Sequence, residues 1–276
     1  MRAPKQWSNS GMLDEITPVI LTGNEERNIG RTLAQLAWAK DVVVVDSMSG
    51  DATVALAQTF PNVRVFPRPL DTLAKQWTFA VEETGIRTPW VLTLDADYFV
   101  TPELVEELRA LDPPTRTTAY VARFLYAIHG RPLHGSLYPP RMVLLRRGRF
   151  VFYQDGHTQR VRIDDLASTL RSPIIHDDRK GVGRFFTRQL RYMEDEADKL
   201  LDSKRRGSLR DRIRRLRIVA PPLVFLHTLF VKGVIRDGWP GVYYALERFA
   251  AELILSMILI ERDLASLTRA GSSDRP

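Results

Sequence analysis

The feature that most constrains the fold of this chain is a run of four consecutive valines, in the segment DVVVVD at residues 41–46. An apolar run without polar alternation is typical of a strand whose two faces are both buried. Such strands belong to parallel sheets that carry helices on both faces. The valine run therefore predicts an interior strand of an α/β domain.

Strand and helix patterns alternate around this run. Short apolar segments predict strands at residues 16–21, 41–45, 63–66 and 90–94. The segments between and after them predict helices at residues 28–39, 51–59, 73–83 and 101–111. Alternation at these spacings predicts a Rossmann-like, mostly parallel sheet with flanking crossover helices.

The pattern changes after Pro113 and Pro114, where short segments are separated by glycine and proline. These segments predict further strands at residues 119–128, 142–146, 150–153 and 160–163. From about residue 181 the pattern becomes helical, with long charged amphipathic segments. We therefore predict an α/β domain over residues 1–180 and a C-terminal helical extension over residues 181–276.

Composition excludes several classes of protein. With 44% hydrophobic and 26% charged residues among 276, the chain has the composition of a globular protein and not of a disordered one. It contains no cysteine, which excludes a disulfide framework and thiolate metal sites and fits a reducing compartment. The first residues, MRAPKQWSNSGMLDE, contain no apolar core of a signal peptide, so no secretory signal is expected.

Two carboxylates, Asp95 and Asp97, directly follow the apolar run WVLTL. Ligands of open parallel sheets gather at the carboxyl ends of the strands, and residues two apart on an extended chain share a face. Two carboxylates aimed at one point suit Mg²⁺ or Mn²⁺, which would hold a diphosphate. The alternative is that both aspartates form the turn and cap the following helix.

Polar residues also follow the first two predicted strands. After residues 16–21 the loop contains Thr22, Asn24 and Glu25, and Asp46 and Ser47 end the valine strand. These side chains either contact a nucleotide or have local structural roles. Thr22 and Glu25 have capping-box spacing, and Ser49 or Asp51 can cap the next helix.

Three segments in this order, ILTGNEERNIGRTL, VVVVDSMSGDAT and WVLTLDAD, resemble the N-terminal half of inverting family 2 glycosyltransferases, which have the GT-A fold. The similarity is greatest to the bacterial β-1,4-glucosyltransferase-like subgroup of lipopolysaccharide-core assembly. It extends through FPRPLDTLAKQWTFAVE, RPLHGSLYPPRMVLLRRGRF and IIHDDRK to about residue 180, and again to GWPGVYYALERF. The resemblance implies a nucleotide-diphosphate sugar donor, with UDP as the expected nucleotide, and a bound Mn²⁺ or Mg²⁺.

The resemblance also assigns roles to single residues. It places Thr22, Glu25 and Ser47 around the nucleoside, and it places Asp95 and Asp97 at the ribose, the diphosphate and the metal. Asp97 is the stronger candidate for direct metal contact. Asn24, Asp46 and Lys75 are further candidate donor contacts. The chain departs from the family pattern at two positions: Ser47 stands where many members have aspartate, which bears on the base contacts, and Thr78 stands where many have asparagine.

An inverting transfer needs a general base that deprotonates the acceptor hydroxyl. The subgroup often has His-Glu in the relevant segment, whereas this chain has His157-Thr158 within YQDGHTQRV. Asp155 and His157 are therefore the two candidate bases. The alternatives are that Asp155 forms a turn before Gly156 and that His157 is a surface residue.

A late histidine closes the metal site in many GT-A enzymes, and His176 in IIHDD is the candidate for that position. The alternative for His176 is a structural hydrogen bond. The segment HGSLY, residues 134–138, is a candidate donor or acceptor loop. Arg141, Arg146 and Arg147 are candidate phosphate partners, with a solvated strand face as the alternative.

The net charge of +7 favours an anionic partner. The run KRRGSLRDRIRRLR, from Lys204 to Arg217, has eight basic residues and one acid in fourteen positions. It contains no aromatic residue, so nucleic-acid binding is not expected. Apolar segments at residues 218–235 and 250–260 follow, and they are either core helices or interfacial membrane helices. We therefore expect a peripheral protein on the cytoplasmic face of the cell membrane, with the basic run on anionic lipid.

Together these patterns predict a metal-dependent inverting transferase that acts on a lipid-linked or lipopolysaccharide-type glycan. Two rivals remain at the level of the sequence. A sugar nucleotidyltransferase would need a glycine- and arginine-rich phosphate loop after the first strand, and LTGNEER is not one. A degenerate transferase domain that acts as a basic membrane-binding scaffold is compatible with the missing glutamate beside His157.

Overall fold

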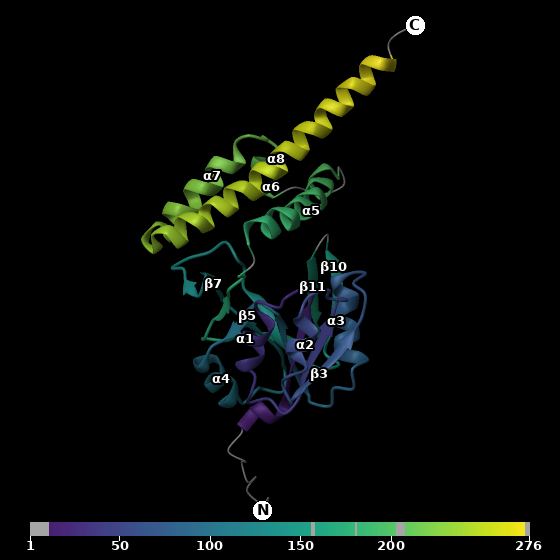
Figure 1. The fold of residues 1–276 in the computed structure, drawn as a ribbon, viewed down its shortest axis with the longest axis vertical. Helices are drawn as coiled ribbons and strands as arrows, with labels where there is room; N and C mark the ends of the chain where they lie inside the picture. Colours follow the sequence, from purple (N-terminus) through teal and green to yellow (C-terminus); the bar gives the residue numbers. More distant parts are fainter. Residues whose placement is uncertain (1–10, 156–157, 180, 203–207, 274–276) are drawn as a thin grey trace, which may run out of the picture. The chain divides into compact units, whose positions relative to one another are not determined.

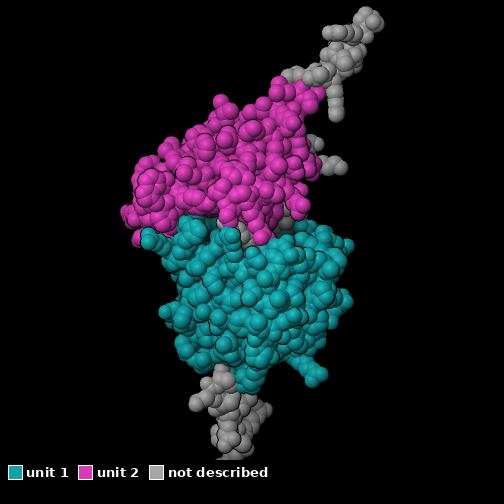
Figure 2. All heavy atoms as spheres, in the orientation of Figure 1, with its two compact units in different colours: residues 1–132, 138–179 teal, residues 133–137, 180–276 magenta. Residues whose placement is uncertain are grey.

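A computed structural model describes residues 11–155, 158–179, 181–202 and 208–273. The chain divides into two units, coloured separately in Figure 2. Unit 1 comprises the residues up to Pro132 together with Tyr138–Arg179, and unit 2 comprises Leu133–Leu137 together with Lys180–Pro276. The chain therefore enters unit 2 twice, first through a segment of five residues.

The central sheet of unit 1 has seven strands in the order β12-β6-β9-β4-β1-β2-β3. The parallel part contains β1 (Ile16–Thr22), β2 (Val42–Asp46), β3 (Val63–Pro67) and β4 (Trp90–Asp95). The remaining strands are β6 (Thr117–Ala122), β9 (Arg141–Arg146), which is antiparallel to both of its neighbours, and β12 (Leu166–Thr169). The predicted mostly parallel α/β sheet is confirmed.

Both faces of the valine strand are buried, as its sequence predicts. Val42 and Val44 pack in one hydrophobic cluster, and Val43 and Val45 pack in another on the opposite face of the sheet. All four side chains have no exposed surface. Burying one such side chain contributes about 1.5–3 kcal/mol, so this strand anchors both layers of the core.

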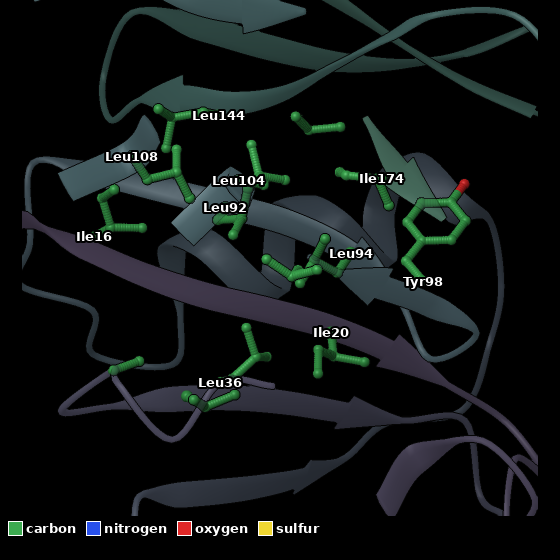
Figure 3. Packing of buried hydrophobic residues seen from close by; sticks show 14 of the residues in the cluster. Ile16, Ile20, Leu36, Leu92, Leu94, Tyr98, Leu104, Leu108, Leu144 and Ile174 are labelled. Atoms are coloured by element: carbon green, nitrogen blue, oxygen red, sulfur yellow. The ribbon is translucent and has the colours of Figure 1, made fainter. Parts of the chain in front are cut away.

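Helices cover the two faces. The first cluster contains side chains of α1 (Ile29–Ala34) and α4 (Pro102–Arg109), and Figure 3 shows Leu104 and Leu108 packed near Leu92 and Leu144. The second cluster contains side chains of α3 (Leu73–Glu82). The short helix α2 (Thr53–Ala57) connects β2 to β3. Figure 1 shows these helices around the sheet.

A smaller sheet in unit 1 was only partly predicted. Its order is β5-β13-β7-β8, from β5 (Tyr98–Val100), β13 (Ile174–His176), β7 (Phe124–Ile128) and β8 (Arg131–Pro132). The single strand predicted at residues 119–128 is wrong, because it breaks at Arg123 into β6 and β7, which belong to different sheets. A separate hairpin of β10 (Phe150–Asp155) and β11 (Thr158–Ile163) packs against α3 through Phe152 and Trp77, whose ring centroids lie 5.8 Å apart.

Unit 2 is helical, as predicted. It contains α5 (Val182–Leu201), α6 (Leu209–Arg214), α7 (Ala220–Leu226) and α8 (Trp239–Ser273), of which α5 and α7 pack along α8 (Figure 1). Between α7 and α8 lie one π-helical turn, His227–Val231, and one 3-10 turn, Val234–Asp237. Within the described part of the chain, no helix is both long and apolar enough to cross a membrane.

Ion pairs join the helices of unit 2, and one of them is buried. Arg214 on α6 donates to both carboxylate oxygens of Glu252 on α8, and it also donates to Glu196 on α5 over 2.7 Å. The side chains of Arg214 and Glu252 are each 6% exposed. Arg217 forms a second ion pair with Asp263 on α8. These pairs use two arginines of the basic run inside the unit.

Candidate functional site

The ends of three neighbouring parallel strands place the first candidate residues along one edge of the sheet. Thr22 on β1 is the register partner of Asp46 on β2, and Leu21 is the register partner of Asp95 on β4. The strands are parallel, so their carboxyl ends meet at this edge, where open α/β sheets bind ligands. The predicted convergence of these three strand ends is therefore present.

Hydrogen bonds join the loops that follow β1 and β2. The carboxylate of Asp46 accepts from the backbone N of Ser49 over 2.8 Å and from its hydroxyl. Ser49 Oγ accepts from the backbone N of Asn24, and Asn24 Oδ1 accepts from the backbone N of Gly50. Asn24 has a φ of +56°, a conformation that asparagine tolerates better than most residues. Asp46 and Asn24 thus shape the loops.

The predicted capping box of Thr22 and Glu25 is wrong, because α1 begins only at Ile29. Glu25 is buried, its carboxylate accepts from Asn28 Nδ2 over 2.9 Å, and its backbone N donates to Thr53 Oγ1. Asp51 accepts from the backbone N of Thr53 over 3.0 Å, so it stabilises the start of α2, although Ala52 stands at the cap position itself. Among the described residues, no group hydrogen-bonds the buried Oγ1 of Thr22.

Asp95 and Asp97 lie in a cluster of aromatic and cationic side chains. The hydroxyl of Tyr98 hydrogen-bonds Asp95 and also the hydroxyl of Tyr138. The guanidinium of Arg141 lies 5.0 Å from the centre of the Tyr138 ring. Figure 3 shows the ring of Tyr98 beside Ile174, with its hydroxyl directed away from the labelled apolar side chains.

His176 completes this cluster from the smaller sheet. Its Nε2 lies 3.3 Å from Oδ2 of Asp97, and its ring lies edge-on to the rings of Tyr98, Tyr126 and Tyr138 at centroid distances of 4.9–5.4 Å. Within the described part of the chain, its buried Nδ1 has no hydrogen-bond partner. The structure therefore places His176 in contact with Asp97, and both lie close enough to Asp95 for their charges to act on it.

The burial of Asp95 and Asp97 shifts the pKa values of the titratable groups in the cluster. Burial, and then the charge of Asp97, raise the pKa of Asp95. Burial, and then the charge of Asp95, raise the pKa of Tyr98, which keeps its hydroxyl protonated as a donor. Burial lowers the pKa of Arg141, but the surrounding tyrosine hydroxyls and the two carboxylates raise it by more, so this residue stays a cation. The site thus has one fixed positive charge and an excess of carboxylates.

These residues fit a divalent cation. Carboxylate oxygens and an imidazole nitrogen are ligands of Mn²⁺, and carboxylate oxygens alone suit Mg²⁺. Among the described residues, no three acidic or histidine side chains gather as a ready-made metal cluster. A Mg²⁺-type site commonly has one or two carboxylates and takes its other ligands from phosphates and water. Asp95 and Asp97 match that arrangement in the type and number of their ligand atoms.

Asp177, directly after His176, was not predicted to have a role. Its carboxylate accepts from Arg31 Nη1 on α1 over 2.7 Å, from Arg179 Nε over 2.9 Å and from the backbone N of Gly130 over 3.0 Å. Its backbone N donates to the carbonyl of Asp97 over 3.1 Å. Burial raises the pKa of Asp177, but these hydrogen bonds lower it by more. Asp177 therefore joins the backbone at Asp97 to the backbone at Gly130, next to the metal candidate His176.

The helix α3 connects the second strand end to the hairpin with the candidate base. Gln76 Nε2 donates to Ser47 Oγ over 3.3 Å, and the backbone N of Ala74 donates to Gln154 Oε1 over 3.1 Å. Asp155, the next residue along, is half-buried and lies 3.3 Å from Arg160 Nε. The helix α3 therefore hydrogen-bonds Ser47 at one point and Gln154, the neighbour of Asp155, at another.

Several candidates lie elsewhere. Lys75 is largely exposed on α3, with its ammonium 3.4 Å from Asp71, and His157 lies outside the described residues. Arg146 donates to the carbonyl of Thr115 and Arg147 to that of Thr88, so both have structural partners at the start of β4 and not at its carboxyl end. Of the three arginines considered as phosphate partners, Arg141 is the one that lies in the cluster.

The aromatic members of the cluster were missed from the sequence. Tyr98 directly follows Asp97 in DADY, and that adjacency was an available signal. Tyr138 was included only as part of the candidate loop HGSLY. The structure divides that loop, because His134, Gly135, Ser136 and Leu137 belong to unit 2 and Tyr138 belongs to unit 1.

Glycosyltransferases are among the known proteins to which this chain is similar. The model of the family described as Glycosyl transferase family 2 matches residues 18–166. The lipopolysaccharide core biosynthesis glycosyltransferase LpsC of Rhizobium meliloti is 28% identical over 84% of this chain and 86% of its own. An uncharacterized glycosyltransferase of Rickettsia conorii is 31% identical over 49% of this chain and 46% of its own. The crystal structure of S. aureus TarS with UDP-GlcNAc is 16% identical, covers 86% of this chain and 81% of that one, and has a TM-score of 0.45.

Proposed function

Since this chain belongs to glycosyl transferase family 2, we propose that it transfers a sugar from a UDP-sugar to a lipid-linked or lipopolysaccharide-type glycan, with inversion at the anomeric carbon. One observation carries the proposal most directly. Asp95, Asp97, His176 and Arg141 lie together at the carboxyl edge of the sheet, where β1 also ends in Thr22, whose hydroxyl has no hydrogen-bond partner among the described residues. This is a site for an anionic ligand that brings a cation with it.

The strand ends of β1 and β2 form the nucleoside side of the proposed site. Thr22 has a buried hydroxyl that lacks a partner among the described residues, and a ribose or base would supply one. Ser47 is held by Gln76 next to it. Glu25, Asn24 and Asp46 keep the two loops in place, so we assign them positioning roles and leave direct contact to Thr22 and Ser47.

The carboxylates form the diphosphate side. Asp97, with Asp95 behind it, would hold Mn²⁺ or Mg²⁺, and the ion when bound would neutralise the charge that develops on the leaving diphosphate. His176 orients the carboxylate of Asp97 through its Nε2. Arg141 is a permanent cation close to both aspartates, so it is suited to attract the donor phosphates.

In an inverting transfer the acceptor hydroxyl loses its proton as its oxygen bonds to the anomeric carbon. The bond from that carbon to the diphosphate oxygen breaks on the opposite face, and the diphosphate leaves with the electron pair. We assign proton removal to Asp155, which ends β10 beside Gln154. His157, which lies outside the described residues, is the alternative base.

The proposed acceptor and location follow from relatives and from charge. LpsC is named for lipopolysaccharide core biosynthesis and aligns over most of both chains, which supports an acceptor of that type. The net charge of +7 supports a peripheral position on an anionic membrane surface, which we propose to be the cytoplasmic face. Residues 181–276 would then form the membrane-associating region, next to a catalytic domain over residues 1–180.

A donor panel tests the proposal. The purified chain is mixed with UDP-, GDP-, ADP- and dTDP-sugars, with and without Mn²⁺, while thermal shift and nucleotide release are followed. We expect stabilisation by a UDP-sugar with Mn²⁺ and slow release of UDP, both lost in Asp97→Asn. The variant Asp165→Asn, at a surface ion pair with Arg116, is the control. Failure to bind any donor, or an Asp97→Asn protein equal to wild type, would contradict the proposal.

A further inference from the structure

The turn that joins α7 to α8, residues 230–239 with the sequence FVKGVIRDGW, exposes large apolar side chains. We call it the α7–α8 turn. Phe230 is 61% exposed, Val231 72%, Ile235 47% and Trp239 84%. Single exposed apolar residues are ordinary on a protein surface, but four within ten positions, including an almost fully exposed tryptophan, mark an interaction site.

Close packing and a backbone hydrogen bond hold the backbone of this turn, although its large apolar side chains are exposed. Val234 is fully buried, and a Cβ on Gly241 would lie 1.7 Å from its carbonyl oxygen, which shows how closely α8 packs on the turn. The backbone N of Lys232 donates to the carbonyl of His227 over 2.9 Å. Gly135 contacts the turn so closely that a Cβ there would lie 2.3 Å from the Lys232 carbonyl oxygen. The apolar side chains are held outward on a rigid base.

The charged side chains that the turn exposes to solvent are positive. Lys232 and Arg236 are both exposed. Asp237 is the one acid in the ten residues, and its side chain is only 7% exposed. It accepts from the backbone N of His134 over 3.1 Å and contacts the ring of the same histidine. An outward surface of apolar side chains and cations therefore remains.

The apolar surface continues along α7. Val219, Leu223, Leu226 and Phe230 are spaced by four, three and four residues, so they share one face of this helical segment, and all four are exposed. On the other face, Phe225 packs against Phe249 of α8 at a centroid distance of 6.0 Å. The helix thus has one face for α8 and another, equally apolar, without a partner among the described residues.

Three arginines of the basic run are engaged within unit 2, whereas Arg210 and Arg212 are exposed. Arg214 is buried against Glu252 and Glu196, Arg217 pairs with Asp263, and Arg215 donates to the carbonyl of Leu200 over 2.7 Å. These guanidinium groups have partners within unit 2, and residues 203–207 lie outside the described residues. Lys232 and Arg236, by contrast, are exposed among the large apolar side chains of the turn.

We propose that the α7–α8 turn is the element that docks on an anionic lipid bilayer. Trp239 and Phe230 would enter the interface between head groups and acyl chains, where aromatic residues are favoured, and Lys232 and Arg236 would meet lipid phosphates. The other occupant to consider is a second copy of this chain, but two like-charged turns would then face each other. The inference deepens the membrane part of the proposed function by naming its contact residues.

Vesicle sedimentation of the full chain tests the turn. Vesicles of phosphatidylcholine alone are compared with vesicles that contain phosphatidylglycerol, at low and high salt. We expect wild type to prefer the anionic vesicles, and F230S/W239S to bind them at least about tenfold more weakly. K232Q/R236Q should lose roughly tenfold on anionic vesicles and show little salt dependence. The control L166S changes an exposed leucine of unit 1 and should bind like wild type.

A second measurement does not depend on loss-of-function variants. The chain has no cysteine, so V231C and L166C can each be labelled at one site with an environment-sensitive fluorophore. We expect a blue shift on anionic vesicles at residue 231 and none at residue 166. Equal signals at both sites, wild-type binding by F230S/W239S, or a dimer that this variant dissociates would each overturn the inference. Release of UDP without any acceptor reports the proposed catalytic function separately, and it should be unchanged in all these variants.

Discussion

The imidazole of His176 lies 3.3 Å from the carboxylate of Asp97, although 79 residues separate them in the chain. Asp97 lies two residues after the end of β4 in the large sheet, and His176 is the last residue of β13 in the small sheet. The contact therefore joins the edges of two sheets at the point where the proposed metal would sit. A ligand bound to Asp97 would therefore change the contact between this carboxylate and His176 of the small sheet.

This relationship predicts different roles for the two residues. Asp97→Asn should abolish Mn²⁺-dependent stabilisation by the donor and lower UDP release by about a hundredfold or more, because it removes a charge that the metal needs. His176→Gln retains a polar side chain beside Asp97 and should lower metal affinity by about 10- to 100-fold while high Mn²⁺ restores turnover. Mn²⁺ titration of UDP release checks both. Equal Mn²⁺ dependence in His176→Gln and wild type would argue against the positioning role.

Without metal, Asp95 should reduce the stability of the fold at neutral pH. Burial and the charge of Asp97 raise its pKa above the ordinary 3.8, so the native state loses stability as the pH rises from 3.8 through the raised value. Asp95→Asn should therefore raise the Tm in EDTA at pH 7 by a few °C, with the gain vanishing below about pH 4. Thermal unfolding from pH 4 to 8 measures this.

The control for this experiment is Asp71→Asn, because its effect should have the opposite sign. Hydrogen bonding to Arg68 lowers the pKa of Asp71, which is fully exposed. Its contribution is present above the ordinary carboxyl pKa and is lost as the pH falls, so the variant should gain no stability at pH 7. A Tm gain in Asp71→Asn equal to that in Asp95→Asn would show that the effect is a general one of net charge.

Much of the fold could be predicted, because local patterns determine it. The valines of β2 predicted burial on both faces, and the polar residues after β1, β2 and β4 predicted the edge where the site lies. The small sheet could not be predicted in the same way, since β5 and β13 have only three residues each and depend on each other and on β7. The capping alternative for Thr22 and Glu25 failed because the backbone N of Glu25 donates to Thr53 Oγ1, in the segment after β2, and not to Thr22.

Asp177 should be a stabilising residue and not a catalytic one. Its carboxylate holds Arg31, Arg179 and Gly130, and its side chain is 4% exposed. Asp177→Asn should lower the free energy of unfolding by about 2–4 kcal/mol at pH 7, because two partly exposed arginines and the backbone N–H of Gly130 lose their buried charged acceptor. Asp165→Asn, at an exposed pair, should cost less than about 1 kcal/mol. Urea unfolding of both variants measures the difference.

The buried pair of Arg214 and Glu252 should show strong coupling. R214M should cost about 3–5 kcal/mol, because the buried carboxylate of Glu252 loses its main charged partner, and E252Q should cost less, because Arg214 keeps its ion pair with Glu196. R214M/E252L removes both charges and should recover at least half of the loss in R214M. Arg217→Met, at a pair in which Asp263 is half-exposed, is the control and should cost about 1 kcal/mol or less. Additive losses in the double variant would contradict this account.

The close packing of Gly135 on Lys232 limits how the helical region could be exchanged between related proteins. Residues 133–137 belong to unit 2 although their flanks belong to unit 1, and no side chain fits between Gly135 and the Lys232 carbonyl. A hybrid made by exchanging everything after residue 179 with a relative would separate His134 from its partner Asp237. A crossover that transplants the C-terminal helices must therefore carry this five-residue insert with them, so the natural unit of inheritance for the helical region is discontinuous in the gene.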